Sequence, residues 1–384
     1  MQYTKLKSIN EYVSESINPM KLPDTLFEMY TVPIYETGHP EYLKGSEIGS
    51  NKAKVRKNDV LLCKINPRIN RVWVVADESE NQSIASSEWI VIRSSTYNPE
   101  FLAWYFRCPK FKKLMTSEVT GIGGSLTRAQ PKAVAEYPVP VLSKNEQEEI
   151  VNILNRANSI INIRKQELQK LDDLIRARFV DMFGAPASNP MGWPETTVGK
   201  VCHYIKDGPH KSLPDIGQEN GGHPFISVRN IVNHVIDFST AKYISDEDYA
   251  EARKKCSPEK GDMLYSKGGT TGIAKLVDID VEFANWVHLA VLKFDHSVLD
   301  GIFFENMLNC DYCYDQSQRL TKGIANRDLV LSAMAQIKIY RPPMVLQEQF
   351  AAFVAQVDKS KAVIQKSLDE TQLLFDSLMQ KYFG

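Results

Sequence analysis

A long, uninterrupted helical pattern constrains this chain more than any other feature. Between Asn145 and Gly184, apolar residues recur at alternating spacings of three and four, with no proline in the run and no glycine before Gly184. This spacing is typical of the seam of a coiled coil, and a glycine followed closely by Pro186 is typical of a helix end. At 1.5 Å per residue the predicted helix is roughly 60 Å long. A helix of that length needs an equally long partner to cover its apolar stripe.

A second pattern of the same kind closes the chain, from Leu346 to Gly384. Both segments follow a proline-bearing, strand-like stretch, carry a Glu-Gln pair near their start and end in Phe-Gly, with an offset of 202 residues at the start and 200 at the end. This predicts an internal repeat of a whole domain plus a helix. We expect the two helices to lie antiparallel, with Ile161 and Ile364 buried near the middle. The predicted pairing residues are Ile150, Leu154, Ile161, Leu168, Leu171, Ile175, Phe353, Val357, Ile364, Leu368, Phe375 and Leu378.

Composition indicates an ordinary globular protein of the cytoplasm. The chain has 384 residues, of which 43% are hydrophobic, and no apolar run approaches the ~18 residues of a membrane span. Its first residues lack the apolar core of a signal peptide. The six cysteines are scattered, and the close pair Cys310 and Cys313 has no second pair at zinc spacing. We therefore predict reduced thiols, no metal site and no contact with a membrane.

The repeat predicts an α+β fold with approximate two-fold symmetry. Two tandem globular α/β domains, residues 1–143 and 186–343, are each followed by a long helical spacer, residues 144–185 and 344–384. Lys57–Lys64 aligns with Lys260–Lys267, and Ile84-Ala85 aligns with Phe283-Ala284. The two domains differ most in the loops that follow the aligned strands, as expected of domains that read different ligands.

Those loops are basic. Residues 52–71 carry seven Lys or Arg against one acid, and residues 253–275 carry six against two. Lys and Arg neutralise phosphates, and Arg and Asn can also pair with guanine and adenine edges. A single basic run is more often a solvated loop, but two runs at matched places in a repeat leave solvated loops and nucleic-acid binding equally open. The glycine-rich segment 267–272 does not fit the nucleotide-binding pattern G-x-x-x-x-G-K-[ST].

The second domain carries the segments that identify a family. It opens with Trp193-Pro194 and Val198-Gly-Lys-Val201, followed by Asp207-Gly-Pro-His210, Pro224-Phe-Ile-Ser-Val-Arg-Asn-Ile231 and Ile236-Asp237. This order, together with the Pro-x-Pro and Glu-Gln elements before each long helix, resembles the DNA specificity subunit of Type I restriction-modification enzymes. The resemblance covers nearly the whole chain. The first domain departs from it, because it lacks the Trp-Pro opening and the Asp-Gly-Pro-His segment.

The resemblance implies a DNA-reading subunit without a catalytic centre or cofactor of its own. Its partners would be double-stranded DNA, two modification subunits that use S-adenosylmethionine, and restriction subunits that use ATP and Mg²⁺. Each domain would read one half of a split, asymmetric sequence across a gap set by the paired helices. We expect phosphate contacts from Lys52, Lys54 and Lys267, and base contacts from Asn66, Arg68, Arg71, His210, Lys211, Thr270 and Thr271. Lys64, Asn70, Arg128, Arg229, Asn230 and Arg327 complete the predicted DNA-binding set.

Two other functions remain open at this point. The first is an interaction scaffold of the same fold in another defence complex, which salt-dependent, sequence-selective DNA binding would exclude. The second is a standalone enzyme. The sequence disfavours it, because it contains no Asn-Pro-Pro-aromatic methylation motif, no Walker loop and no convincing catalytic triad. His210 and Arg229 are more simply interpreted as DNA-contacting or hydrogen-bonding residues.

Overall fold

The chain forms two compact units in a computed structural model that describes residues 2–76, 79–117, 119–120, 127–323 and 327–384. The first unit comprises residues 1–165 and 366–384, and the second comprises residues 166–365. Each unit therefore contains one globular domain and a half of each long helix. The two units are described separately.

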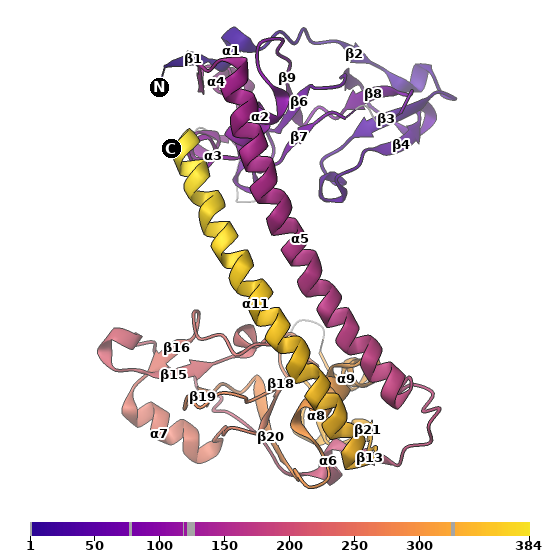
Figure 1. The fold of residues 1–384 in the computed structure, drawn as a ribbon, viewed down its shortest axis with the longest axis vertical. Coiled ribbons are helices and arrows are strands. Elements are labelled where there is room, and N and C mark those ends of the chain that lie inside the picture. The colour runs from indigo at the N-terminus through magenta and orange to yellow at the C-terminus, as the bar shows by residue number, and fades with distance from the viewer. Residues whose placement is uncertain (1, 77–78, 118, 121–126, 324–326) are drawn as a thin grey trace. The chain divides into compact units, whose positions relative to one another are not determined.

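The two long helices are α5, Lys144–Phe183, and α11, Met344–Phe383, each of 40 residues. Figure 1 shows each as a single unbroken helix. After α5, the backbone N–H of Gly184 donates to the carbonyl of Val180 (2.8 Å) at a φ of +77°, a conformation that favours glycine. The helices begin 200 residues apart. The offset of 202 residues predicted between the two helix starts is therefore wrong. The first turn of α11 contains no acidic residue, and Glu348 lies beyond it.

The helices run antiparallel within each unit. In the first unit, Ile150 and Leu154 near the start of α5 share a core with Met379 and Phe383 at the end of α11. In the second unit, the end of α5 meets the start of α11, where the rings of Phe179 and Phe350 lie 5.5 Å apart. Lys361 of α11 also forms an ion pair with Asp172 of α5 (2.7 Å). The predicted antiparallel pairing is thus confirmed in both units.

Burial along the seam is uneven. Of the predicted pairing residues, those that are buried are Ile150, Leu154, Ile161, Ile175, Val357 and Leu368, and those that are half-buried are Leu168, Leu171, Phe353, Ile364, Phe375 and Leu378. Ile161 is therefore buried as expected, whereas Ile364 is not. The pattern also omitted Val151, Phe179, Val354 and Met379, which are buried because they meet a globular core as well as the partner helix.

The first unit arranges its strands in several small sheets. Its five-stranded sheet has the order β2-β5-β8-β3-β4 and its three-stranded sheet the order β7-β6-β9, beside the pairs β1-β12 and β10-β11. The strands are β1 Tyr3–Lys5, β2 Ser16–Ile17, β3 Leu26–Tyr30, β4 Glu41–Lys44, β5 Lys52–Lys54, β6 Val60–Cys63, β7 Val72–Val74, β8 Gln82–Ala85, β9 Trp89–Ile92, β10 Val119–Thr120, β11 Arg128–Ala129 and β12 Pro138–Pro140. The short helices are α1 Leu6–Ile9, α2 Pro99–Arg107, α3 Pro109–Ser117 and α4 Pro131–Val134.

The second unit has a four-stranded sheet, β14-β20-β17-β18, a three-stranded sheet, β16-β15-β19, and the pair β13-β21. The strands are β13 Glu195–Thr197, β14 Cys202–Asp207, β15 His223–Ile226, β16 Lys242–Ile244, β17 Met263–Ser266, β18 Ala274–Leu276, β19 Ala284–Asn285, β20 Leu289–Phe294 and β21 Lys338–Tyr340. The short helices are α6 Val198–Val201, α7 Asp246–Lys255, α8 Gly301–Asn309, α9 Asp311–Leu320 and α10 Leu331–Met334.

The two units share the central part of their topology, although their sheets differ in strand number. A central strand, β6 or β17, lies between two antiparallel neighbours, and one parallel pair, β3-β8 or β15-β19, accompanies it. The internal repeat and the α+β class are therefore confirmed. The structure corrects the alignment of the two domains by one residue. The backbone N–H of Ser86 donates to Tyr30 and that of Trp286 donates to Ile226, so these two residues are equivalent. Ile84-Ala85 therefore corresponds to Ala284-Asn285 and not to Phe283-Ala284.

A buried glutamine joins each long helix to its globular domain. The Gln147 side chain accepts from the backbone N–H of Asn98 (2.8 Å) and donates to the carbonyl of Leu142 (3.0 Å). Gln347 accepts in the same way from Asp300 (2.9 Å) and donates to Pro342 (2.8 Å). Asn98 and Asp300 are the N-cap residues of α2 and α8. One amide therefore fixes the start of a spacer helix to the start of a domain helix in each unit.

We predict that Gln347→Leu lowers the free energy of unfolding by about 1–3 kcal/mol. The shape is kept, but the N–H of Asp300 and the carbonyls of Pro342 and Val298 lose their hydrogen-bond partner. Chemical denaturation followed by circular dichroism measures this change. The control is Gln349→Leu, two residues further on and exposed, for which we expect a change within about 0.5 kcal/mol. Equal effects of the two variants would show that the Gln347 hydrogen bonds do not matter to stability.

Candidate nucleic-acid interface

The predicted basic loops begin at the same structural position in both units, immediately after β6 and β17. The N–H of Lys64 donates to Glu88 (3.0 Å) and that of Lys267 to His288 (2.8 Å). The carbonyls of the same two lysines accept from Ala129 (2.8 Å) and Leu329 (2.7 Å). We call this arrangement the recognition frame, formed by Lys64, Asn66, Glu88, Thr127, Arg128 and Ala129 in the first unit and by Lys267, Gly269, His288, Arg327, Asp328 and Leu329 in the second.

A further backbone hydrogen bond completes the frame. The N–H of Asn66 donates to Thr127 (2.8 Å), and that of Gly269 donates to Arg327 (3.1 Å). The frame therefore brings three loops together in each unit, although their residues lie far apart in the sequence. Three of the predicted DNA-binding residues, Lys64, Asn66 and Arg128, meet there in the first unit, and Lys267 and Arg327 meet there in the second.

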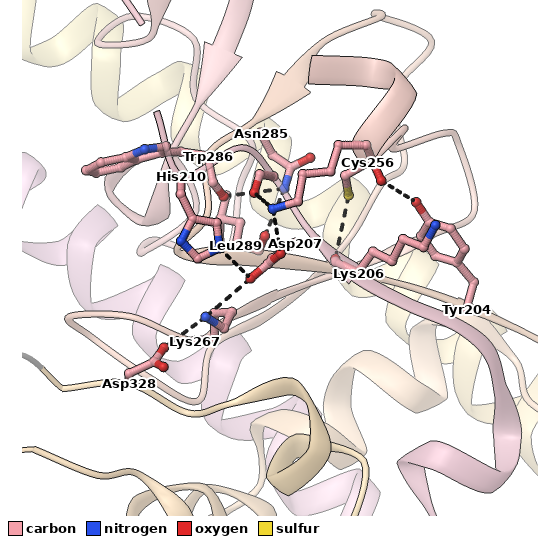
Figure 2. Close-up of polar contacts among 12 residues, drawn as sticks. Tyr204, Lys206, Asp207, His210, Cys256, Lys267, Asn285, Trp286, Leu289 and Asp328 are labelled. Atoms are coloured by element: carbon pink, nitrogen blue, oxygen red, sulfur yellow. Dashed lines mark hydrogen bonds and ion pairs between the residues drawn. The ribbon is translucent and has the colours of Figure 1, made fainter. Parts of the chain in front are cut away.

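In the second unit, a buried ion network holds the frame together (Figure 2). The ammonium of Lys267, 5% exposed, lies 2.8 Å from Asp328 and 3.4 Å from Asp207. Asp207 also pairs with Lys255 (3.1 Å), and His210 approaches it at 3.9 Å. The Lys267 side chain thus ties together the end of β14, the end of β17 and the segment before α10. It is a positioning residue in this geometry, with its charge turned toward the protein.

Close packing against the backbone of Asn285 explains why a glycine follows Asp207. A Cβ atom at this position would lie 1.7 Å from the backbone oxygen of Asn285, a distance that no side chain can accommodate. The Lys255 ammonium donates to the Gly208 carbonyl (2.5 Å) as well as to the Asp207 carboxylate. The segment Asp207-Gly-Pro-His210 therefore packs its first two residues into the frame, and the His210 imidazole, 75% exposed, points into solvent.

The 267–272 loop is anchored by its threonines and by α9. Thr271 is buried, and its hydroxyl lies 3.1 Å from that of Thr321. The amide of Gln318 donates to the Thr271 carbonyl (3.0 Å) and accepts from the Arg327 guanidinium. Thr270 is exposed at the tip of the loop. Thr270 is therefore accessible to a ligand, whereas Thr271 acts on the position of Gln318 and Arg327.

In the first unit, the corresponding loop is built around two asparagines. Asn66 and Asn70 have φ values of +48° and +56° and flank a short 3-10 turn, Pro67–Ile69. Asparagine tolerates this left-handed conformation better than most residues. The turn exposes Arg68 at its tip. The asparagines of this loop therefore have a structural role in forming the turn, in addition to their predicted role in DNA binding.

Buried polar atoms without hydrogen-bond partners gather beside the frame. Within the described ranges they include Asn66 Oδ1, Asn70 Oδ1, Arg71 Nε and Glu88 Oε2 in the first unit, and Asn285 Oδ1 and Trp286 Nε1 in the second. Orphaned polar atoms of this kind are costly unless water or a ligand satisfies them. Asn66 and Glu88 belong to the first frame itself, so their orphaned oxygens make that frame suited to a polar ligand.

Other predicted residues lie outside the frame. Lys52 is buried in β5, where its ammonium donates to the backbone and hydroxyl oxygens of Ser50 (3.2 and 2.5 Å), and burial lowers its pKa. Lys54 is half-buried in the same strand. Asn230 is buried in its own turn and donates to the Asp237 carbonyl (2.8 Å). Arg229 is exposed beside it, and Lys211 is exposed and lies 3.8 Å from Asp248.

The structure adds residues that the basic-loop argument missed: Glu88, Asp207, Trp286, His288, Gln318 and Asp328. The acidic residues among them were overlooked because the search for DNA contacts considered mainly positively charged side chains. Glu88 and Asp328 are the counter-charges of the exposed Arg128 and the buried Lys267. The sequence signal for Trp286 and His288 is only their position, two and four residues after Ala284 in the aligned repeat.

Metal-binding clusters and membrane-spanning helices are both absent from the part of the chain that the structure describes. No group of three or more His, Cys, Asp or Glu side chains is placed to hold a metal ion there. The described helices also include none with the length and apolar character that a membrane crossing requires. The hydrogen bond between Cys310 and Cys313 lowers the pKa of Cys310, and burial raises the pKa of Cys313.

The duplicated fold and its paired frames match one family. The family model of the Type I restriction modification DNA specificity domain matches residues 3–173 and 190–372, once in each half of the chain. The chain therefore belongs to this family, and its function is sequence-specific DNA recognition in a Type I restriction-modification complex. Specificity subunits direct the complex to DNA and do not catalyse its reactions, so this chain is a non-catalytic component.

Individual relatives are distant. The chain is 22% identical to the Type I restriction enzyme MjaIX specificity subunit of Methanocaldococcus jannaschii over 301 residues, which are 73% of this chain and 67% of that protein. It resembles the crystal structure of the S subunit of a Type I restriction-modification system from M. genitalium (TM-score 0.57, 14% identity, 100% and 96% of the two chains). It also resembles a chain from a structural study of complex assembly and conformational transition of the type I R-M system (TM-score 0.56, 19% identity, 100% and 97%). These likenesses show a shared fold.

We predict that Lys267→Met lowers the free energy of unfolding by about 2 kcal/mol, because two carboxylates lose a buried cation. The expected cost is below that of a fully buried pair, since Asp328 is partly exposed and Lys255 still pairs with Asp207. Urea denaturation measures the change. Lys260→Met, which removes an exposed lysine paired with Asp280, is the control and should be nearly neutral. A neutral Lys267→Met would refute the positioning role.

Proposed function

We propose that this chain reads a split, asymmetric DNA sequence, one half with residues 1–143 and the other with residues 186–343. In this proposal, residues 144–185 and 344–384 are the spacers that set the gap. The observation that carries it is the recognition frame. The same backbone hydrogen bonds recur in both units, whereas the side chains mounted on them differ in charge and size. A protein that reads two unlike half-sites needs such a common support with different readers.

The accessible side chains around each frame are the proposed base readers. In the first unit these are Asn66, Arg68, Arg71 and Arg128, with Lys64 and Asn70 beside them. In the second unit they are His210, Thr270 and Arg327. Lys211 and Arg229 are exposed outside the frame and are proposed as additional contacts, whereas Asn230 is buried and supports its own turn. Arg and Asn can pair with purine edges in the major groove. Lys54 remains a proposed phosphate contact. Lys52 and Lys267 were also expected at phosphates, but both are buried, and Lys267 is neutralised by Asp207 and Asp328, so neither is proposed as a direct phosphate contact.

We further propose two modification subunits per chain, together with restriction subunits. S-adenosylmethionine, ATP and Mg²⁺ would then serve those partners. The internal repeat supports two copies of the modification subunit. Each long helix also carries a pair of exposed apolar residues, namely Ile163 and Leu174 on α5 and Val363 and Leu374 on α11. Residues 11 apart lie on nearly the same face of a helix. The two helices therefore carry equivalent apolar positions, suited to two copies of one partner.

The half-site assignment predicts separable effects. Arg68→Ala should alter base preference only in the half-site read by residues 1–143, and His210→Ala only in the other half. Losing a direct base contact costs about 1–3 kcal/mol at one position. The measurement is binding of the purified complex to two DNA libraries, each with one half-site randomised. Thr271→Ala should also act only on the second half, through the positions of Gln318 and Arg327.

Two results would count against this proposal. If Arg68→Ala changed both halves equally, or neither, the assignment of the 64–71 loop to base reading would be wrong. If wild-type binding showed no sequence preference at any salt concentration, the chain would act as an interaction scaffold instead. Sequencing of methylated adenines in cells that carry the complete system would return both half-sites together.

The partner proposal predicts a stepwise loss of subunits. Leu374→Asp should remove one of two modification subunits from the complex, and Leu174→Asp combined with Leu374→Asp should remove both, because a charge replaces an apolar contact. Native mass spectrometry of the co-expressed complex counts the copies. The control is Lys359→Asp, which places an acid at another exposed position of α11. One modification subunit per wild-type chain at saturation would contradict the proposal.

A further inference from the structure

Residues 128 and 328 occupy the same place in the recognition frame and carry opposite charges. Each directly precedes the residue whose N–H donates to the strand-end lysine, Ala129 in the first unit and Leu329 in the second. Arg128 donates from Nη2 to Glu88 Oε1 (3.0 Å), and its side chain is 50% exposed. Asp328 Oδ1 accepts from Lys267 (2.8 Å), and its side chain is 47% exposed. Both side chains are therefore held in place at one atom and remain accessible at the others.

The neighbouring lysines reinforce this contrast. Lys267 is neutralised inside the protein by Asp207 and Asp328. Lys64, at the equivalent position, is half-buried and makes no ion pair within the described residues. The first frame therefore presents hydrogen-bond donors and net positive charge. The second frame has turned its lysine inward and presents the carboxylate of Asp328 beside the exposed guanidinium of Arg327. The contrast between the two frames therefore concerns the position of residues 128 and 328 and not the net charge of the whole frame.

The chemistry of base edges gives these two polarities different targets. A guanidinium supported at one nitrogen offers its remaining N–H groups to the paired acceptors O6 and N7 of guanine. A carboxylate matches the amino group of cytosine in the major groove. Adenine suits a carboxylate less well, because its acceptor N7 lies beside its amino group and would face the second carboxylate oxygen.

We propose that Arg128 and Asp328 are specificity-determining residues, with Arg128 reading a guanine in one half-site and Asp328 reading a cytosine in the other. Glu88 and Lys267 act as positioning residues that hold the two readers. This inference rests on the proposed split-site function and deepens it. It assigns opposite hydrogen-bonding polarity to equivalent points of the two recognition surfaces, which makes the half-sites unlike.

The test replaces each reader by an amide, which favours adenine because it can both donate to N7 and accept from N6. Arg128→Gln should change guanine to adenine at one position of the first half-site, and Asp328→Asn should change cytosine to adenine at one position of the second. The expected loss on the original sequence is roughly 5- to 150-fold, from the usual discrimination of a bidentate contact. The assay is binding of the complete complex to libraries with one half-site randomised.

Matched controls separate base reading from a structural effect. Arg156→Gln changes an exposed arginine of α5, and Asp280→Asn changes an exposed aspartate paired with Lys260. Neither should alter base preference. Thermal unfolding of each variant shows whether the fold is retained. A structural role for Arg128 or Asp328 would weaken binding to all sequences alike, without a change of preferred base.

The possible results are distinguishable. A switch to adenine at one position, confined to the expected half-site, supports the proposal. Unchanged preference in both variants, or uniform weakening, overturns it while the split-site function stands. A wild-type complex without any sequence preference would instead refute the proposed function itself.

Discussion

The hydrogen bonds of one buried glutamine amide in each unit hold the architecture together. Gln147 and Gln347 each link the first turn of a 40-residue helix to the N-cap residue of a helix in the adjoining globular domain. A long helix that left its domain without such a contact could swing freely at its start. The amide fixes that start, while the aromatic side chains around Phe350 and Phe383 bury the rest of the junction. Spacing between two DNA-reading domains requires such rigid junctions.

The recognition frame allows the proposed base-reading side chains to differ between the two units while the backbone hydrogen bonds that hold them stay the same. Backbone groups form its hydrogen bonds, so they tolerate almost any side chain at the positions they hold. Arg128 and Asp328 illustrate the result, since opposite charges occupy one backbone position. Each needs its own counter-charge, Glu88 or Lys267, and these partners come from different segments. In the proposed function, a new base preference at this position therefore requires at least two coordinated changes.

Sequence reasoning predicted the frame-bearing strands but assigned some side chains differently from their positions in the fold. Lys267 was expected at a phosphate because it lies in a basic, glycine-rich run, whereas it is buried between two carboxylates. Lys52 was expected at the surface and is buried. Asp207 and Asp328 lie 60 and 61 residues from Lys267 along the chain, in segments that no local pattern connects to it. Positive charge in a sequence does not show whether a counter-charge lies nearby in space.

By itself, the sequence determined the repeat, the two long helices, their antiparallel pairing and the class of DNA-reading protein. The repeat and the helices follow from periodicity and from segments that recur along the chain, and their pairing follows from the repeat. The class of protein follows from the resemblance of several short segments to a known family. Only the tertiary structure decided the 200-residue register, the half-burial of Ile364 and the grouping of three loops into each recognition frame. Burial and ion pairing depend on which distant segments meet, and that depends on how whole sheets and helices pack rather than on any one stretch of residues.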